Sequence, residues 1–353
     1  MISYLPMKRL IASLCAAACL SAAADLPVRG IHLMAPRPGE VPAAAKFIAE
    51  TLPRHGINLV VLEINYGYRY SKRPNITDGH ALSRSDAAQL VAASRKAGIR
   101  LMPMINLLGH QSWGKTTFAL LRAHPEFDET PGRYPANEGI YCRSYCPLHP
   151  GVHAVVFDLI DELVEAFEAD AFHIGMDEVF LIGEDDCPRC RGKSKAGLFA
   201  GEVRALHAHL AQSGRQVWMW GDRFLDGETT GMGRWEASTN FTFDALRQMP
   251  RDIVICDWHY EKPHPTAAWF ALEGFQVVSS PWRKPEVALG QLALMNAVRA
   301  NGSQEVAARM LGMMQTTWGS FGNFLKAYNG EPGAQKNMLE VVECLKKLFP
   351  VNP

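Results

Sequence analysis

Two adjacent acidic residues, Asp177 and Glu178, are the strongest candidates for chemistry in this sequence. They follow the apolar run 171–176 and precede a second apolar run, 179–182, which disfavours the alternative of a solvated surface pair. Two carboxylates this close cannot both be comfortably ionised in a partly dry site, so one of them should keep its proton at neutral pH. The pair therefore indicates a general acid beside an ionised carboxylate.

The elements that position this pair follow a repeated pattern, in which short β-rich apolar runs alternate with amphipathic stretches. Helices are expected between the runs, for example over 85–97, which begins at a Ser and stops at Gly98, and over 198–212. Eight such βα units over about 300 residues predict one (β/α)8 barrel of the α/β class rather than an open sheet. The runs are 30–35, 57–64, 99–106, 171–176, 216–220, 253–257, 275–279 and 313–317.

The residues that follow these runs are unusually polar and aromatic. Barrel enzymes carry their active sites at the carboxyl ends of the strands, so these positions should share one cleft. Trp and Tyr beside carboxylates suit a sugar, whose C–H faces stack on aromatic rings. Any single Trp could instead cap the barrel core, but Trp220, Trp258 and Trp318 each follow or end a run, and together they favour a cleft.

The fourth run reads Ala-Phe-His-Ile-Gly-Met-Asp-Glu-Val over residues 171–179. It resembles the strand-four signature His-x-Gly-Gly-Asp-Glu of the family 20 glycoside hydrolases, the β-N-acetylhexosaminidase family, with Met176 in place of the second Gly. Arg37 is similar to the first-strand Arg of that family, and Pro103 with Gly109-His110 is similar to its third-strand pattern. The resemblance spans the chain from about Val28 to Trp318.

The resemblance implies a retaining, substrate-assisted hydrolysis of terminal β-linked N-acetylhexosamine that needs no catalytic metal. It assigns the general acid to Glu178 and orientation of the 2-acetamido group to Asp177. It places His110 beside the acid, although a loop histidine without a catalytic role fits the sequence equally well. Tyr260 is the candidate for the Tyr that completes the acetamide clamp, and Trp282 has a comparable place one strand later. The implied sugar-binding residues are Arg37, Trp220, Asp222, Trp258, Tyr260, Trp282 and Trp318.

Several positions depart from the family pattern and keep two other functions open. Met104 and Asn106 replace a Glu and an Asp, Glu63 and Tyr66 replace a His and an Asp, and Ser320 replaces a Glu. One alternative is a retaining glycosidase that uses Asp177 or Glu63 as nucleophile on sugars without the acetamide. The other is a catalytically inactive carbohydrate-binding barrel.

Four cysteines form two close pairs, Cys142 with Cys146 and Cys187 with Cys190, on stretches that flank the fourth run. A structural zinc held by four thiolates is one interpretation, favoured by the two-residue spacer of the second pair. Disulfides are the competing interpretation, because the chain has the features of an exported protein.

The first 24 residues have the pattern of a secretory signal peptide, with Lys8-Arg9, an apolar run and a small-residue exit. Export to the periplasm or the extracellular space is expected, with residues 25–353 as one catalytic domain. The whole chain has 36 Lys+Arg and 36 Asp+Glu, and loss of Lys8 and Arg9 leaves 34 against 36, a net charge of −2. This balance gives no electrostatic reason to expect a nucleic acid or an anionic membrane as partner. A neutral ligand fits better.

Overall fold

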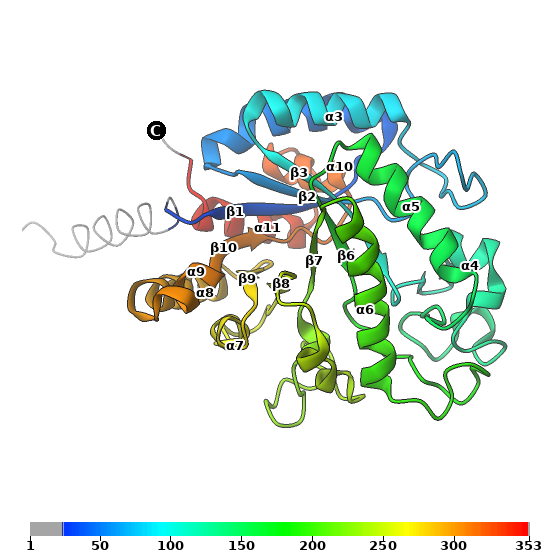
Figure 1. The fold of residues 1–353 in the computed structure, drawn as a ribbon. Coiled ribbons are helices and arrows are strands. Elements are labelled where there is room, and N and C mark those ends of the chain that lie inside the picture. Colours follow the sequence, from blue (N-terminus) through cyan, green and yellow to red (C-terminus); the bar gives the residue numbers. More distant parts are fainter. Residues whose placement is uncertain (1–22, 24, 352–353) are drawn as a thin grey trace, which may run out of the picture.

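Eight parallel strands close into a barrel at the centre of the computed structural model, which describes residue 23 and residues 25–351 (Figure 1). Their order around the barrel is β1-β10-β9-β8-β7-β6-β3-β2. Each of the eight predicted runs overlaps one of these strands, so the predicted (β/α)8 barrel is confirmed. The predicted signal peptide lies almost entirely outside the described residues. The strands are β1 Val28–Met34, β2 Leu59–Glu63, β3 Arg100–Leu107, β6 Ala171–Gly175, β7 Gln216–Trp220, β8 Val254–Asp257, β9 Gln276–Ser279 and β10 Met310–Gln315.

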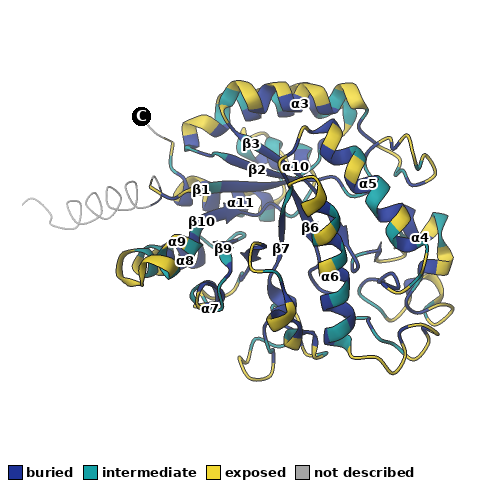
Figure 2. Ribbon diagram, viewed as in Figure 1, coloured by how far each residue is buried: buried dark blue, intermediate teal, exposed yellow. Residues whose placement is uncertain are grey.

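The strands are buried on both faces, which explains why they read as continuous apolar runs (Figure 2). Alternate side chains fill the barrel interior, including Val61, Met102, Trp218 and Met314. The intervening side chains, such as Val60, pack against the surrounding helices in a larger hydrophobic core. The outer faces of these helices are exposed (Figure 2).

The helices surround the barrel and have local start and stop signals. Ser83 caps α3 by accepting a hydrogen bond from the Asp86 N–H, and Gly98 ends it with a left-handed φ of 65°. The helices are α2 Val41–Lys46, α3 Arg84–Ala97, α4 Ala119–Ala123, α5 Val152–Ala166, α6 Lys195–Gln212, α7 Thr266–Leu272, α8 Pro285–Asn301, α9 Gln304–Arg309, α10 Phe321–Tyr328 and α11 Lys336–Leu348. Among the described residues, no helix has the length and apolar character needed to span a membrane.

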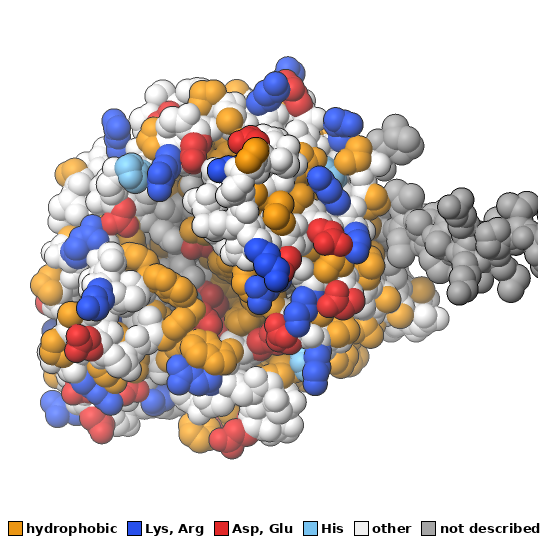
Figure 3. Space-filling view, turned by 180° about the vertical axis from the view of Figure 1, so that it is seen from behind, with side chains coloured by type: hydrophobic (Ala, Val, Ile, Leu, Met, Phe, Trp, Pro, Cys, Tyr) orange, Lys and Arg blue, Asp and Glu red, His pale blue; other side chains and the backbone are white. Residues whose placement is uncertain are grey.

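Two long connections flank β6 and rise from the carboxyl ends of the strands. The connection from β3 to α5 contains α4 and a small antiparallel hairpin of β4 Ser112–Trp113 and β5 Thr116–Thr117. The connection from β6 to α6 carries Asp177 and Glu178 at its start. One face of the molecule is hollowed near its centre, and positive and negative side chains are intermixed around it (Figure 3).

Closure of the barrel between β1 and β10 depends on Gly312, which pairs with Val28. Its φ is 149°, and a Cβ at this position would lie 2.0 Å from the Val28 carbonyl oxygen. Gly312→Ala should therefore lower the free energy of unfolding by about 2 kcal/mol or more. Gly201→Ala in α6 is the matched control, because its Cβ would meet nothing within 4 Å and helix propensity favours Ala by roughly 0.5–1 kcal/mol. Urea unfolding of both variants checks this, and equal stability of the two would contradict it.

Candidate active site

The chain turns sharply where β6 ends, and this turn brings the two carboxylates to the same place. Gly175 has a φ of 71° and lies so close to β3 that a Cβ there would be 2.3 Å from the Asn106 Oδ1. Met176 and Glu178 also have left-handed backbones, with φ of 75° and 49°. Such conformations cost on the order of 1–3 kcal/mol each for residues other than glycine and are typical of functional sites. Met176 therefore adopts, at a cost, a backbone conformation that suits a glycine.

The Asp177 carboxylate is held from two sides. Its Oδ1 accepts a hydrogen bond from the Asn106 Nδ2 at 2.7 Å. On the other side, the His110 Nε2 lies 3.4 Å from the Asp177 Oδ2 and 3.1 Å from the Glu178 Oε2. The structure thus brings together the three residues that the sequence proposed as catalytic, His110, Asp177 and Glu178. His110 lies between the two carboxylates.

The charges of this group stabilise one another. Burial lowers the pKa of His110, but the carboxylates of Asp177 and Glu178 outweigh it and raise the pKa well above 6.5. Burial raises the pKa of Asp177, but His110 and the Asn106 amide outweigh it and hold that pKa below its usual value. Asp177 is therefore ionised at neutral pH beside an imidazolium. The ligand atoms of His110, Asp177 and Glu178 also lie within 4.8 Å of one another, a spacing that a metal ion could use. A cation there would compete with the proton for the His110 nitrogen.

A buried polar chain continues behind Asn106 across the bottom of the site. The Asn65 Oδ1 accepts a hydrogen bond from the Asn106 N–H at 2.8 Å, and the Asn65 Nδ2 donates to the Glu63 Oε1 at 2.8 Å. The other carboxylate oxygen of Glu63 lies 2.9 Å from the His32 Nε2. Both oxygens of Glu63 are therefore engaged, and the chain holds the backbone of Asn106, whose side-chain amide contacts Asp177.

The backbone and carboxylate of Glu178 have separate partners. Its N–H donates to the Asp222 Oδ2 at 3.0 Å, and the same oxygen accepts from the Arg223 Nε at 2.6 Å. The Tyr141 hydroxyl lies beside the Glu178 carboxyl group, and burial together with this neighbour raises the pKa of Tyr141. Asp222 was predicted to bind sugar, and this prediction is corrected, because its side chain is fully buried beneath the loop. It holds Glu178 instead.

Four of the predicted aromatic residues form one wall. The ring of Tyr260 lies 4.9 Å from that of Trp258 and 5.4 Å from that of Trp282, and its hydroxyl accepts a hydrogen bond from the Trp318 Nε1 at 2.5 Å. Trp220 was predicted to line the cleft as well, but it is fully buried. It packs 5.6 Å from Trp318, between ring centroids, and supports the wall from inside the barrel.

A second group of aromatic residues was missed by the sequence analysis. Tyr141 lies between Trp113 and Trp235, each 5.0 Å away between ring centroids, and Trp113 stacks 6.4 Å from His110. Trp113 and Trp235 are 55% and 47% exposed, far more than an aromatic core residue. All three belong to long connections rather than strand ends, so the unusual length of these connections was the available signal.

Arg37 follows β1 at the same end of the barrel and is exposed. Its backbone N–H donates to the Glu40 Oε2 at 2.9 Å, and its guanidinium forms no salt bridge within the described part of the chain. It remains available for a hydroxyl-rich ligand.

The predicted set of four clustered cysteines is corrected by the structure. Cys146, Cys187 and Cys190 converge, but Cys142 does not join them. Its thiol points instead to the Glu178 carbonyl oxygen, 3.8 Å away. Glu129 occupies the place next to the three thiols that the prediction gave to Cys142.

The wall that carries Tyr260 is anchored by a buried histidine. The Glu236 carboxylate accepts from the Tyr260 N–H at 2.9 Å and lies 3.0 Å from the His259 Nδ1. Burial lowers the pKa of His259, but Asp257 and Glu236 outweigh it and raise the pKa to about 9. A raised pKa stabilises the folded state fully below pH 6.5, and this contribution is lost as the pH rises from 6.5 to about 9.

We therefore expect the difference in unfolding free energy between the wild type and His259→Gln to shrink across this pH range, by on the order of 3 kcal/mol. Chemical denaturation at several pH values measures it. A difference that stays constant or grows with pH would contradict the charged state of His259.

Comparison with known proteins agrees with the fold. Residues 62–320 match the model of the glycosyl hydrolase family 20 catalytic domain. A chitobiase from Flavobacterium johnsoniae is 19% identical with a TM-score of 0.64, over 92% of this chain and 48% of that one. An exo-β-N-acetylglucosaminidase from Vibrio harveyi, solved with N-acetylglucosamine, is 15% identical with a TM-score of 0.63, over 91% of this chain and 54% of that one. Dispersin B is 16% identical with a TM-score of 0.50, over 91% of this chain and 97% of that one.

The chain spans about half the length of the first two of these structures. The search of curated proteins found no match. These likenesses extend over the barrel, and the family match covers most of the chain, including all three catalytic candidates. The chain belongs to glycosyl hydrolase family 20.

Proposed function

We propose that this protein hydrolyses terminal β-linked N-acetylhexosamine with retention of configuration, and that the 2-acetamido group of the substrate is the nucleophile. The observation that carries the proposal is the ionised Asp177, held by Asn106 and His110 directly beside Glu178. Membership of family 20 supports a glycoside hydrolase of this kind. We also propose that residues 25–353 act after export as one catalytic domain on a carbohydrate.

Asp177 is proposed to accept a hydrogen bond from the acetamide N–H. This contact would orient the acetamide carbonyl oxygen toward the anomeric carbon and stabilise the positive charge that develops as the oxygen attacks. The Asn106 amide keeps the carboxylate ionised and fixes its direction. Tyr260, on the aromatic wall, is the proposed partner for the acetamide oxygen.

Glu178 is proposed to give its proton to the departing glycosidic oxygen and then to take a proton from the water that opens the cyclic intermediate. Asp222 fixes its backbone, and His110 and Tyr141 lie beside its carboxylate. The proposed chemistry uses only these side chains and the substrate's own amide.

The sugar is proposed to stack on the wall of Trp258, Trp282 and Trp318, with Arg37 available to its hydroxyls. Trp113 and Trp235 are exposed and pack against Tyr141, which lies beside Glu178. They are proposed to contact the leaving group of the substrate.

The two alternatives from the sequence differ from this proposal in their response to one inhibitor. N-acetylglucosamine thiazoline mimics the cyclic intermediate and should inhibit turnover of an aryl β-N-acetylglucosaminide competitively. Measurable glycosidase activity that the thiazoline leaves unchanged would favour a carboxylate nucleophile. Binding of chitobiose without any turnover would favour an inactive carbohydrate-binding barrel.

Glu178→Gln should affect substrates according to their leaving group. We expect a loss of about 100- to 10,000-fold in kcat/KM with a poor leaving group and a much smaller loss with an activated aryl leaving group, since only the former needs protonation. Asp185→Asn is the control, because Asp185 is an exposed acid on the same connection. Equal losses in kcat/KM on both substrates would show that Glu178 is not the general acid.

Asp177→Asn should instead lower the rate by a similar factor on every acetamido substrate, whatever its leaving group. We expect at least about a 100-fold loss, equivalent to ~2.7 kcal/mol in the barrier, since the internal nucleophile loses its orientation. Steady-state kinetics on the same pair of substrates measures it, with thermal unfolding as a check of the fold. A rate within a few-fold of the wild type would show that Asp177 does not orient the acetamide.

A further inference from the structure

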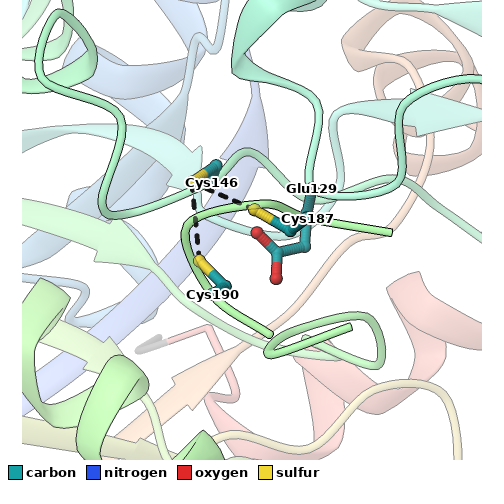
Figure 4. A group of neighbouring side chains, drawn as sticks. All are labelled: Glu129, Cys146, Cys187 and Cys190. Carbon is teal, nitrogen blue, oxygen red and sulfur yellow. Dashed lines mark hydrogen bonds between the residues drawn. The ribbon is translucent and has the colours of Figure 1, made fainter. Parts of the chain in front are cut away.

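A second cluster of ligand-type side chains lies apart from the catalytic residues. Glu129, Cys146, Cys187 and Cys190 are all buried, and their ligand atoms lie within 4.8 Å of one another (Figure 4). The Cys146 Sγ lies 3.4 Å from the sulfurs of both Cys187 and Cys190. Four tetrahedral ligands around a zinc ion with Zn–S bonds of about 2.3 Å would place the sulfurs roughly 3.8 Å apart. The cluster therefore needs only a small expansion to hold such an ion.

Glu129 completes the cluster from a fully buried position. Its Oε1 accepts hydrogen bonds from the N–H groups of Gly183 at 2.7 Å and Glu184 at 3.2 Å. Its Oε2 is buried and has no donor near it other than the thiols. Arg133 and Lys195 pair with the neighbouring Glu184, and no salt bridge to Glu129 occurs among the described residues. A buried carboxylate oxygen without a cation is costly, and a bound metal ion would satisfy it.

The local backbone supplies the thiols in the manner of a metal site. Cys187 and Cys190 lie in one tight turn, in which the Cys187 carbonyl accepts from the Arg191 N–H at 3.0 Å and the Cys190 carbonyl accepts from the Lys193 N–H at 3.1 Å. Cys146 comes from the connection before α5, where its N–H donates to the Phe127 carbonyl at 2.6 Å. Two thiols from a short turn and further ligands from a distant segment are typical of structural zinc sites.

A disulfide explains the cluster less completely. Cys146 has two sulfur neighbours at the same distance, and a bond to either one would leave the third cysteine outside the disulfide, with its thiol as the one donor near the buried Glu129 carboxylate among the described residues. A metal ion would use all four groups together.

We infer that Glu129, Cys146, Cys187 and Cys190 form a tetrahedral site for a thiophilic divalent cation, with Zn²⁺ as the best fit. Binding converts the three thiols to thiolates, releases three protons and adds a carboxylate oxygen as the fourth ligand. The site joins the connection that precedes α5 to the connection that follows Glu178. The bound ion would fix the second connection. Glu129 also contacts this connection directly, because it accepts hydrogen bonds from the N–H groups of Gly183 and Glu184.

Elemental analysis of the purified chain gives the test, together with reconstitution after removal of metal by a chelator. We expect one zinc per chain, or one Zn²⁺ taken up by the stripped protein, and with Co²⁺ the visible bands and thiolate charge-transfer absorption of a tetrahedral site. Cys190→Ser should abolish the stoichiometric binding, and Glu129→Gln should release zinc to a competing chelator more readily than the wild type. Cys344→Ser is the control, because Cys344 is a buried thiol in α11, outside the cluster.

The test does not require Cys190→Ser to fold, because the Co²⁺ spectrum is measured on the wild type. Failure of the stripped wild type to bind either ion would overturn the inference. Peptide mapping that finds a disulfide among Cys146, Cys187 and Cys190 in the metal-free protein as isolated would overturn it too. The inference would also be overturned if Cys190→Ser bound as much zinc per chain as the wild type.

Discussion

The contact between Asp177 and its two neighbours, Asn106 and His110, is the interaction on which the arrangement of the site depends. An ionised carboxylate at a buried strand end is stable only where donors and a positive charge surround it. Asn106 supplies the donor and His110 the charge. The left-handed backbone at Gly175, Met176 and Glu178 is needed to reach this position, so that the contacts of Asp177 offset local strain in the chain.

This interaction also gives a physical meaning to the positions that depart from the family pattern. An acid at position 106 would lie against an ionised Asp177 and would have to be protonated to remain there, whereas the amide of Asn106 donates directly. Glu63 replaces a histidine and pairs with His32, and Asn65 connects that pair to Asn106. Two of the substituted residues, Glu63 and Asn106, thus belong to one connected chain of hydrogen bonds that ends at Asp177.

The barrel and its catalytic end could be predicted from the sequence because both depend on local signals. Parallel strands buried on both faces read as apolar runs, and the carboxyl ends of the strands place His110, Asp177 and Glu178 together. The outcome for Trp220 and Asp222 could not be predicted, because spacing along a strand does not tell whether a side chain at its end faces the cleft or the core. Both are fully buried.

Spacing along the sequence also could not predict which residues reach a site from the long connections. Cys142 has the spacing of a ligand but turns toward Glu178, whereas Glu129 has no motif and joins the three cysteines only through tertiary folding. Tyr141 reaches Glu178 from the connection between β3 and α5 in the same way, and Trp113 of the same connection packs against Tyr141.

The central claim is that Asp177 serves the acetamide of the substrate, and a matched pair of substrates tests it most directly. Hydrolysis rates would be compared for two aryl β-glycosides with the same leaving group, one of N-acetylglucosamine and one of glucose. We expect turnover of the N-acetylglucosaminide. The glucoside has no internal nucleophile, so its hydrolysis rate should be lower by at least about 1,000-fold, equivalent to ~4 kcal/mol in the barrier. Comparable rates on the two substrates would contradict the account and show that the enzyme itself provides the nucleophile.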